Sequence, residues 1–593
     1  MKRQPRTAIL IAALLLSCAL AAWAFQAARQ RPTPPASLTA FVPQGALLTI
    51  ESPDFAKLLD QWNASPEQRA WLRSDNFSVF SNSRLFGRLN DARAEFEGAR
   101  DPSTASSINS DFLTQIAGHQ SVFAWYDVGA LEFLYITRLP AAQADRIALL
   151  KDRRGWTPRQ AGGLTFYLRT STSAADESAH GQARTVAFAQ VPDPNGDLLL
   201  LATREDLIAN ALALHAPAPT QPSILQEPWF TDANTALSST GPAPALHMVL
   251  NLDRIVPLAY FRSYWVQQNI SEMARYRAAV TDLQLDRGTF QEHRALLLKS
   301  PEAPTAQAAL ASLVQLLPEG VYRATATSDP AAALAAIQEK ILGHGTLSSL
   351  PQTSAPDPPL DAAQSGSASN LDTRIDTPPP ATEAVSDDAL RQAIQTAGID
   401  AVLTYGSGEA PATPAGLWVP LHSAVVLHAA SPWKPQAIAD ALQQSLRGTL
   451  TTATLGIDFH PDTTADDTIY ALTGPRPLSF ATHANLLLLS DDRTLLLAIL
   501  HNATAAPLPS QAPATILAGF NHTSQRAPFA RLTSLIDATD QPPGPGTQPR
   551  PPTFFAGNIR SLSDAFRTLS SASFTEHRDH DIIRQDVIYT WHQ

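Results

Sequence analysis

The sequence is poor in cysteine. Only one of its 593 residues is a cysteine, Cys18, and it lies within an apolar segment near the N-terminus. The rest of the chain therefore has no thiol to form a disulfide, to bind a metal or to act as a nucleophile. This absence excludes disulfide-stabilised folds, cysteine-ligated zinc sites and cysteine-dependent hydrolases. It is compatible with an oxidising compartment, although it does not require one.

Charged residues are also scarce. They make up 16% of the chain, against about 25% in an average globular protein. The formal net charge is −11, and no basic stripe is visible. Binding to nucleic acid depends on clustered Lys and Arg, so we predict no nucleic-acid partner. Hydrophobic residues, at 44%, are numerous enough for more than one core in a chain of this length.

The common catalytic signatures are missing as well. The sequence contains no His-Glu-x-x-His, no Walker loop, no Gly-x-Gly-x-x-Gly and no Gly-x-Ser-x-Gly motif. The paired carboxylates Asp387-Asp388 and Asp466-Asp467 resemble helix caps or loop residues, with no base or nucleophile close in sequence. We therefore predict no catalytic residue, no cofactor-binding residue and no cofactor.

The pattern closest to a metal site is the stretch TEHRDHD near the C-terminus. It contains Glu576, His577 and His580 together with two aspartates. Imidazole and carboxylate groups this close in sequence can bind Zn²⁺ or another divalent ion. A polar hairpin turn before the last predicted strand explains the same residues, and we favour the turn. We predict no metal site, and these three residues stay weak candidates.

The N-terminal 30 residues read as a signal peptide or a membrane anchor. A basic start precedes an apolar run from Ala8 to Phe25, which is long for a signal-peptide core and short for a membrane-spanning helix. Three interpretations stay open: an uncleaved anchor, cleavage after Ala24, and a lipoprotein lipidated at Cys18. Under each interpretation the rest of the chain is exported, because the basic residues before the apolar run stay on the cytoplasmic side of the membrane. We predict an extracytoplasmic protein, periplasmic or at the cell surface, anchored in the inner membrane through residues 8–25 or secreted.

Two distant stretches resemble each other closely. DLLLLATREDLIANAL begins at Asp197 and NLLLLSDDRTLLLAIL at Asn485, and each contains a leucine strand, a polar break and an apolar pattern of helical spacing. Other similar stretches recur in the same order, at offsets that range from 275 to 293 residues. The matched pairs are Pro43 and Pro318, Gly118 and Gly398, Pro140 and Pro432, Gly163 and Gly456, Val186 and Leu478, and Leu198 and Leu486. This order predicts two copies of one unit.

We place the two units at 36–305 and 311–593. The second unit contains a flexible insertion at 351–384, which is rich in Pro, Ser, Ala and Asp and has too few apolar residues to form a core. Residues 539–553 have a similar composition. A long amphipathic helix is predicted over 254–280, with the aromatic cluster YFRSYW packed in the core.

A strand, a capping residue and a helix recur within each predicted unit. Ser52 in the first copy, and Ser328 or Asp329 in the second, caps a helix that begins with a proline. Thr203 or Asp491 caps the helix after each leucine strand. Leucine strands without alternation indicate burial on both faces. The predicted fold class is α+β, with two tandem related units whose mixed, largely antiparallel sheets are covered by helices, preceded by one N-terminal apolar helix.

Four short features carry a family resemblance. They are the N-terminal apolar segment, Pro43-x-Gly45 before a strand, Ser52-Pro53 before a helix, and the late strand RQDVIYTW. In these features the chain resembles a family of exported or membrane-anchored bacterial proteins of unknown function with a duplicated α+β domain. The resemblance implies an exported, duplicated scaffold, and it supplies no activity and no catalytic residues.

We therefore expect a non-catalytic envelope protein, tethered to or released from the cytoplasmic membrane, that acts as a binding or assembly scaffold. Its expected partners are the membrane, through residues 8–25 if they are uncleaved, and an envelope protein or glycan. The alternative is an exported hydrolase whose active site lies in the cleft between the two units.

Overall fold

The chain is described by a computed structural model that covers most of residues 37–591. The residues it leaves out within that range are 74–76, 78–79, 83, 98–110, 145–146, 171–184, 217–218, 220, 238–242, 259–269, 287, 303–305, 343–386, 409–420, 451–458, 465–466, 473–476, 506–512, 522, 526 and 529–568. The apolar run at 8–25, the insertion at 351–384, the stretch 539–553 and the aromatic cluster at 260–265 lie outside the described residues. Within the part that is described, no helix is both long enough and apolar enough to cross a membrane.

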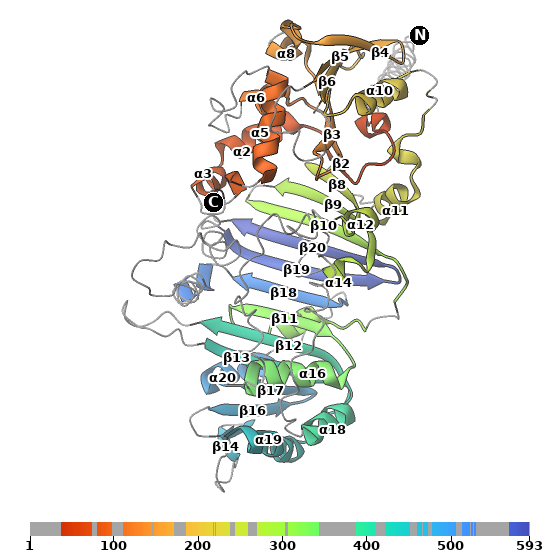
Figure 1. Cartoon of the computed structure of the whole chain (residues 1–593). Helices are drawn as coiled ribbons and strands as arrows, with labels where there is room; N and C mark the ends of the chain where they lie inside the picture. The colour runs from red at the N-terminus through yellow and green to blue at the C-terminus, as the bar shows by residue number, and fades with distance from the viewer. Residues whose placement is uncertain are drawn as a thin grey trace, which may run out of the picture.

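The fold is α+β and is built on one large sheet. Twenty strands form a continuous hydrogen-bonded ladder, and Figure 1 shows them stacked from β4 at one end to β14 at the other. Every pairing between the described strands is antiparallel. The predicted antiparallel character is correct, whereas the prediction of mixed sheets is wrong. Parallel neighbours would need long crossover connections, and among the described strands there are no such neighbours.

The strands fall into two sets with the same order. In sheet order, the first set is β4 (Thr157–Ala161), β5 (Leu164–Thr170), β6 (Thr185–Val191), β7 (Asp197–Ala202), β3 (Glu132–Leu139), β2 (Ser121–Asp127), β1 (Leu48–Ser52), β8 (Leu246–Asn251), β9 (Tyr276–Asp286) and β10 (Thr289–Leu298). The second set is β14 (His460–Thr464), β15 (Asp467–Leu472), β16 (Leu478–His483), β17 (Leu486–Ser490), β13 (Leu421–Ala429), β12 (Ile399–Gly408), β11 (Val321–Ala326), β18 (Ile516–Asn521), β19 (Leu569–Asp579) and β20 (Ile582–Trp591). Adding ten to each label of the first set gives the second. The sets meet where β10 pairs with β20, near the middle of the molecule (Figure 1).

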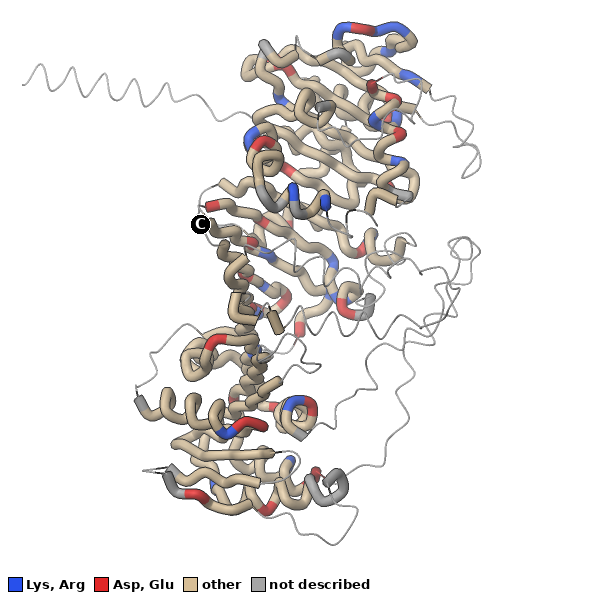
Figure 2. The backbone as a smooth tube through the Cα atoms, turned by 90° about the vertical axis from the view of Figure 1, so that its left-hand side faces the viewer, with Lys and Arg blue, Asp and Glu red and all other residues tan. Residues whose placement is uncertain are grey.

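Helices cover both faces of the sheet in each half. In the first half they are η1 (Leu38–Phe41), α2 (Phe55–Ala64), α3 (Pro66–Leu72), α5 (Arg84–Glu97), α6 (Asp111–Ile116), α7 (Ala141–Ala144), α8 (Ala148–Lys151), α10 (Glu205–Leu214), η3 (Ile224–Gln226), α11 (Pro228–Ala236), α12 (Leu252–Ile255) and α14 (Ile270–Met273). In the second half they are α15 (Leu310–Val314), α16 (Pro330–Ile337), η4 (Gln338–Leu342), α18 (Asp388–Ala397), α19 (Pro435–Leu450) and α20 (Arg493–Ala505). Acidic and basic residues are spread over both halves (Figure 2).

The leucine strands lie between two cores, as their lack of alternation predicts. In β7, Leu198 and Leu200 pack in the core beneath η1, α10 and α11, whereas Leu199 and Leu201 pack in the core on the opposite face. β17 repeats this division, since its leucines alternate between two further cores. Each strand therefore buries apolar side chains on both faces of the sheet, which makes it a central element of the fold.

A cluster of three aromatic rings occurs at the same place in each half. The rings are Trp156, Tyr167 and Phe188 in the first half and Phe459, Tyr470 and Phe480 in the second. In both clusters the tyrosine stacks on the central phenylalanine, with centroids 5.1 Å apart at Phe188 and 4.8 Å apart at Phe480. The third ring meets that phenylalanine edge-on at 4.7 Å and 5.4 Å respectively. Such offset and edge-to-face contacts are the favoured geometries of buried aromatics.

The register of the two halves matches throughout the ladder. Phe188 pairs with a tyrosine on one side and a leucine on the other, and Phe480 does the same. Following cross-strand partners outward from these two residues reaches Arg294 in β10 and Val587 in β20. The residues that precede them, His293 and Asp586, are therefore also equivalent positions. His293 and Asp586 are also direct partners across the β10–β20 ladder. A local two-fold relation between the strands is therefore centred on this pair.

One predicted helix start and one predicted helix differ from the observed structure. The Oγ of Ser52 donates to Ala245 O at 2.9 Å, which keeps Ser52 in β1, and the N-cap of α2 is Asp54. The counterpart helix α16 does begin at Pro330 with Asp329 as its cap, as predicted. The predicted helix over 254–280 is also wrong where it overlaps β9, whose residues from 276 onward are buried with a strand pattern.

The residues predicted to cap the helices after the leucine strands instead bind a neighbouring strand. Thr203 Oγ1 accepts a hydrogen bond from Phe133 N at 2.9 Å, and Asp491 Oδ1 accepts one from Ser423 N at 2.7 Å. The cap of α20 is Asp492, whose Oδ1 accepts from the second and third residues of that helix. The two halves thus place a neutral hydroxyl and a carboxyl in the same role.

Replacing Asp491 by asparagine is expected to raise the melting temperature at pH 7. Burial raises the pKa of Asp491, so the fold favours the protonated carboxyl and loses stability as the pH rises through that raised pKa. Asparagine keeps an oxygen for Ser423 N and carries no charge. Thermal melts should show the advantage of Asp491→Asn shrinking as the pH falls toward 3.8, the ordinary value for the side chain. Equal melting temperatures at pH 7 would contradict this account.

Candidate functional site

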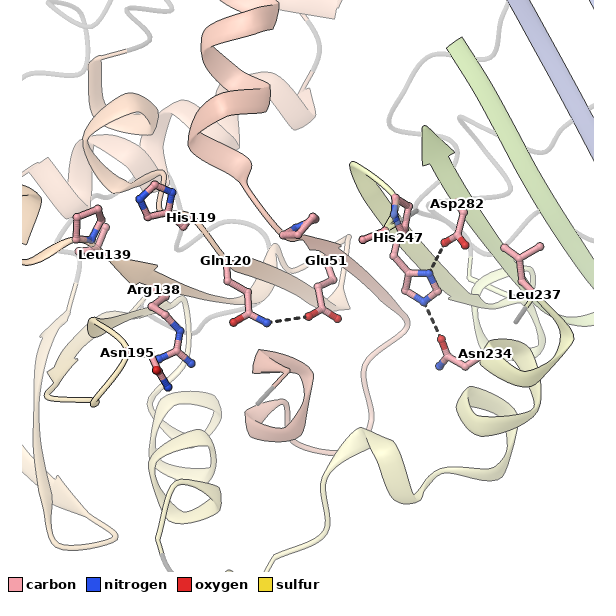
Figure 3. Close-up of a pocket in the computed structure, with 14 residues that line it drawn as sticks. Glu51, His119, Gln120, Arg138, Leu139, Asn195, Asn234, Leu237, His247 and Asp282 are labelled. Carbon is pink, nitrogen blue, oxygen red and sulfur yellow. Dashed lines mark hydrogen bonds and ion pairs between the residues drawn. The ribbon is translucent and has the colours of Figure 1, made fainter. Parts of the chain in front are cut away.

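The first half contains a cavity at the ends of five neighbouring strands. Its volume is about 760 Å³, and it is lined by residues of β1, β8 and β9, by the last residues of β3 and by residues just before β2. Figure 3 shows the lining residues. Three prolines, Pro53, Pro140 and Pro244, form part of its wall. Its polar lining includes Glu51, Gln120, Arg138, Asn234, His247 and Asp282. All residues that line it lie between positions 51 and 282, so it is a feature of the first half and not of the junction between halves.

The strand register places the charged residues of the cavity in one row. Glu51 pairs with His247, and His247 pairs with Asp282. Directly opposed residues point to the same face of a sheet, with Cβ atoms about 4.5–5.5 Å apart. The row continues through His293 to Asp586 at the junction of the halves. We call Glu51, His247, Asp282, His293 and Asp586 the ionic row, in which carboxylates and imidazoles alternate across five strands.

His247 is held at both ring nitrogens. Its Nδ1 lies 2.6 Å from Asp282 Oδ1, and its Nε2 lies 2.7 Å from Asn234 Oδ1 (Figure 3). The Nδ2 of Asn234 donates to Phe230 O at 2.9 Å, which orients the amide so that its oxygen faces the imidazole. Both ring nitrogens therefore lie within hydrogen-bond distance of an oxygen and are engaged within the protein. Since Asp282 is only 5% exposed, this ion pair is largely removed from solvent.

Glu51 receives hydrogen bonds from neutral groups only. Its carboxylate accepts from Ser37 Oγ at 2.8 Å, from Thr39 Oγ1 at 2.7 Å and from Gln120 Nε2 at 3.4 Å. Among the described residues, no Lys, Arg or His forms an ion pair with it. The negative charge of Glu51 is thus solvated by dipoles and is not neutralised by a cation.

Gln120 and Arg138 oppose each other next to Glu51. Arg138 N donates to Gln120 O at 2.8 Å, and the Arg138 side chain forms an ion pair with Asp193. Arg138 is 5% exposed, yet its Nε has no hydrogen-bond partner, and the same is true of the buried Oε1 of Gln120. Buried polar atoms are normally hydrogen-bonded, so two unsatisfied atoms lining one cavity are a notable departure from that rule.

Gly118 allows the backbone to close this corner of the cavity. A Cβ atom at Gly118 would lie 2.2 Å from Arg138 O and 2.4 Å from Thr137 Oγ1. The carbonyl of Arg138 cannot move away easily, because it accepts a hydrogen bond from His119 N at 3.1 Å. Only glycine permits this approach, which sets the positions of the two residues that follow it.

The residues singled out from the sequence lie elsewhere. Glu576 and His577 are in β19, and His580 is in the turn between β19 and β20, where it has a positive φ of 53°. The carboxylate of Glu576 accepts from Arg578 Nε at 2.9 Å and from Gln585 Nε2 at 3.0 Å. His580 Nδ1 lies 2.8 Å from Asp579. In the described part of the chain, no group of three or more His, Cys, Asp or Glu side chains is placed to hold a metal ion.

Sequence reasoning missed the cavity residues because they are far apart in the chain. Glu51, His247 and Asp282 come together only through the pairing of β1, β8 and β9. A signal was present in the segments LTIES, LHMVLN and AAVTDLQL, each of which carries one charged or titratable residue among apolar and neutral polar residues. Without the register, these residues resemble ordinary solvent-facing positions.

Comparisons with known proteins give little further information. No protein-family model matches the chain, and no curated protein matches it. Among solved structures, crystal form I of TP0453 is 13% identical, with 46% of this chain and 82% of that chain covered and a TM-score of 0.23. Crystal form III of TP0453 is 12% identical, with 46% and 84% covered and a TM-score of 0.23. A likeness at this TM-score carries no argument about function.

Proposed function

We propose that the chain is an exported, non-catalytic envelope protein, anchored in the cytoplasmic membrane or released from it, that acts as a binding scaffold. In this proposal it consists of two tandem related units, at 36–305 and 311–593, preceded by the apolar segment at 8–25. The common strand order and the two matching aromatic clusters support the duplication. The duplicated α+β family of exported proteins that the sequence resembles has the same plan.

The hydrogen bonding of His247 at both ring nitrogens is the observation that favours binding over catalysis. A general base needs a free lone pair within hydrogen-bond reach of the proton that it removes. Both nitrogens of His247 are already engaged by Asp282 and Asn234. Arg138 is likewise engaged by Asp193. These side chains are fixed in place, as suits the recognition of a ligand.

The exported hydrolase with an active site between the units is the second candidate. The cavity described above is formed by the first unit alone. This position favours a binding site within one unit over a reaction at the interface of two.

The proposal is tested by fractionation and crosslinking in the native host. A tagged chain should be recovered in the envelope or the medium, and N-terminal sequencing should find either an intact anchor or cleavage near Ala24. Co-purification after crosslinking should recover a specific envelope protein or glycan that is absent when an unrelated exported protein carries the same tag. Recovery of the chain in the cytosol, or of no specific partner, would contradict the proposal.

A further inference from the structure

The second half shows which cavity residues the fold does not need. Carrying the register from strand to strand assigns an equivalent in the second half to four polar residues that line the cavity. The equivalents of Glu51, Gln120, His247 and Asp282 are Ala324, Ala401, Leu517 and Thr575. The same sheet therefore forms with two alanines, a leucine and a threonine at these places, and Ala324 and Ala401 are buried there.

Polar residues at these positions are costly for the first half. Burying a charge or an unpaired polar group is unfavourable unless it gains compensating hydrogen bonds. Arg138 Nε and Gln120 Oε1 gain none within the protein, and Glu51 gains no cation. The packing of the sheet does not explain Glu51 and Gln120, because the second half has alanines at their places, whereas the place of Arg138 is taken by another polar residue, His428. A bound ligand that completes the hydrogen bonds does explain Glu51 and Gln120.

We propose that the cavity of the first half binds a short peptide through its free amino terminus. The terminal ammonium group supplies the cation that Glu51 lacks. The side chains of Gln120 and Arg138, whose Oε1 and Nε are covered by protein in the structure, turn toward the peptide, so that Oε1 accepts from the ammonium group and Nε–H donates to a carbonyl or carboxylate oxygen. This inference rests on the proposed binding function and names the ligand class of that site.

The size and wall of the cavity suit such a ligand. A volume of about 760 Å³ lies within the roughly 300–1,000 Å³ of ligand pockets and exceeds the need of a single amino acid. The prolines Pro53, Pro140 and Pro244 offer rigid apolar contacts to the peptide's side chains. Asp282 is engaged by His247 and Arg138 by Asp193, so Glu51 is the carboxylate of the cavity lining that has no basic partner among the described residues. In this proposal the cavity selects the ammonium group at Glu51 and accepts different peptide side chains along its proline wall.

The test is equilibrium dialysis of the full chain against an equimolar library of tripeptides, read by mass spectrometry. One arm uses free tripeptides and the other uses the same library acetylated at its amino termini. We expect enrichment of free tripeptides and at least tenfold weaker retention of acetylated ones, the loss that follows removal of one charge-assisted hydrogen bond. Retention of both libraries alike, or of neither, would overturn the proposal.

Amino-acid substitutions test whether the tripeptides bind in this cavity. Glu51→Gln keeps the shape of the side chain and should weaken retention of free tripeptides at least tenfold. Gln120→Ala, which copies Ala401 of the second half, should do the same in a fold that accepts alanine there. Glu205→Gln, on an exposed part of α10 outside the cavity, should retain tripeptides like the parent. Unchanged retention in both cavity variants would contradict the assignment. If no tripeptide binds but the crosslinking experiment recovers a specific partner, the peptide proposal is wrong and the scaffold proposal stands.

Discussion

Phe188→Ala and Phe480→Ala will each lower the free energy of unfolding by about 3–5 kcal/mol. Both phenylalanines are fully buried at 0% exposure, and each is the central ring of an aromatic cluster. Removing the ring takes away its apolar burial and leaves a cavity lined by two other rings, which cannot close over the gap. The two losses should be similar because the two clusters have the same geometry.

Urea unfolding followed by circular dichroism and tryptophan fluorescence measures these losses. If the halves unfold in separate transitions, Phe188→Ala should shift one transition and Phe480→Ala the other. Leu421→Ala is the control, since Leu421 is 57% exposed and its truncation should change stability by no more than about 0.5 kcal/mol. A loss below about 1 kcal/mol for either phenylalanine would show that the aromatic clusters contribute little to the stability of the cores.

These clusters also show where sequence comparison succeeds and fails. The match of Val186 with Leu478 is correct, because Phe188 and Phe480 two residues later have equivalent partners. The match of GLTF with GIDF is wrong. Phe459, the last residue of GIDF, precedes β14 and takes the place of Trp156, whereas the Phe of GLTF lies inside β5. A four-residue similarity does not distinguish a strand from the residue before it.

Long apolar patterns were predictable, and positions set by tertiary contacts were not. The leucine strands are recognisable because burial on both faces leaves only apolar residues in β7 and β17. The start of α2 was misplaced because the hydroxyl of Ser52 bonds to Ala245, a residue that approaches only in the folded sheet. The cavity escaped prediction for the same reason. Its charges become a row only when three distant strands pair in register.

His247→Leu will lower the free energy of unfolding by about 3–5 kcal/mol, and adding Asp282→Thr will restore most of that loss. The single variant leaves the Asp282 carboxylate, which is 5% exposed, without the partner at 2.6 Å that compensates its burial. His293 opposes Asp282 across the next ladder but is already held by Asp586 at 2.6 Å, so it does not replace His247. The double variant carries the leucine and threonine that the second half has at these positions.

A double-mutant cycle in urea separates the two contributions. Asp282→Thr alone should cost less than His247→Leu alone, because the side chain of His247 is 23% exposed and can bond to water when its partner is lost, whereas the side chain of Asp282 is only 8% exposed. The double variant should lie within about 1 kcal/mol of the parent, which gives a large coupling between the sites. Additive losses would show that the second half is no guide to what the first half tolerates.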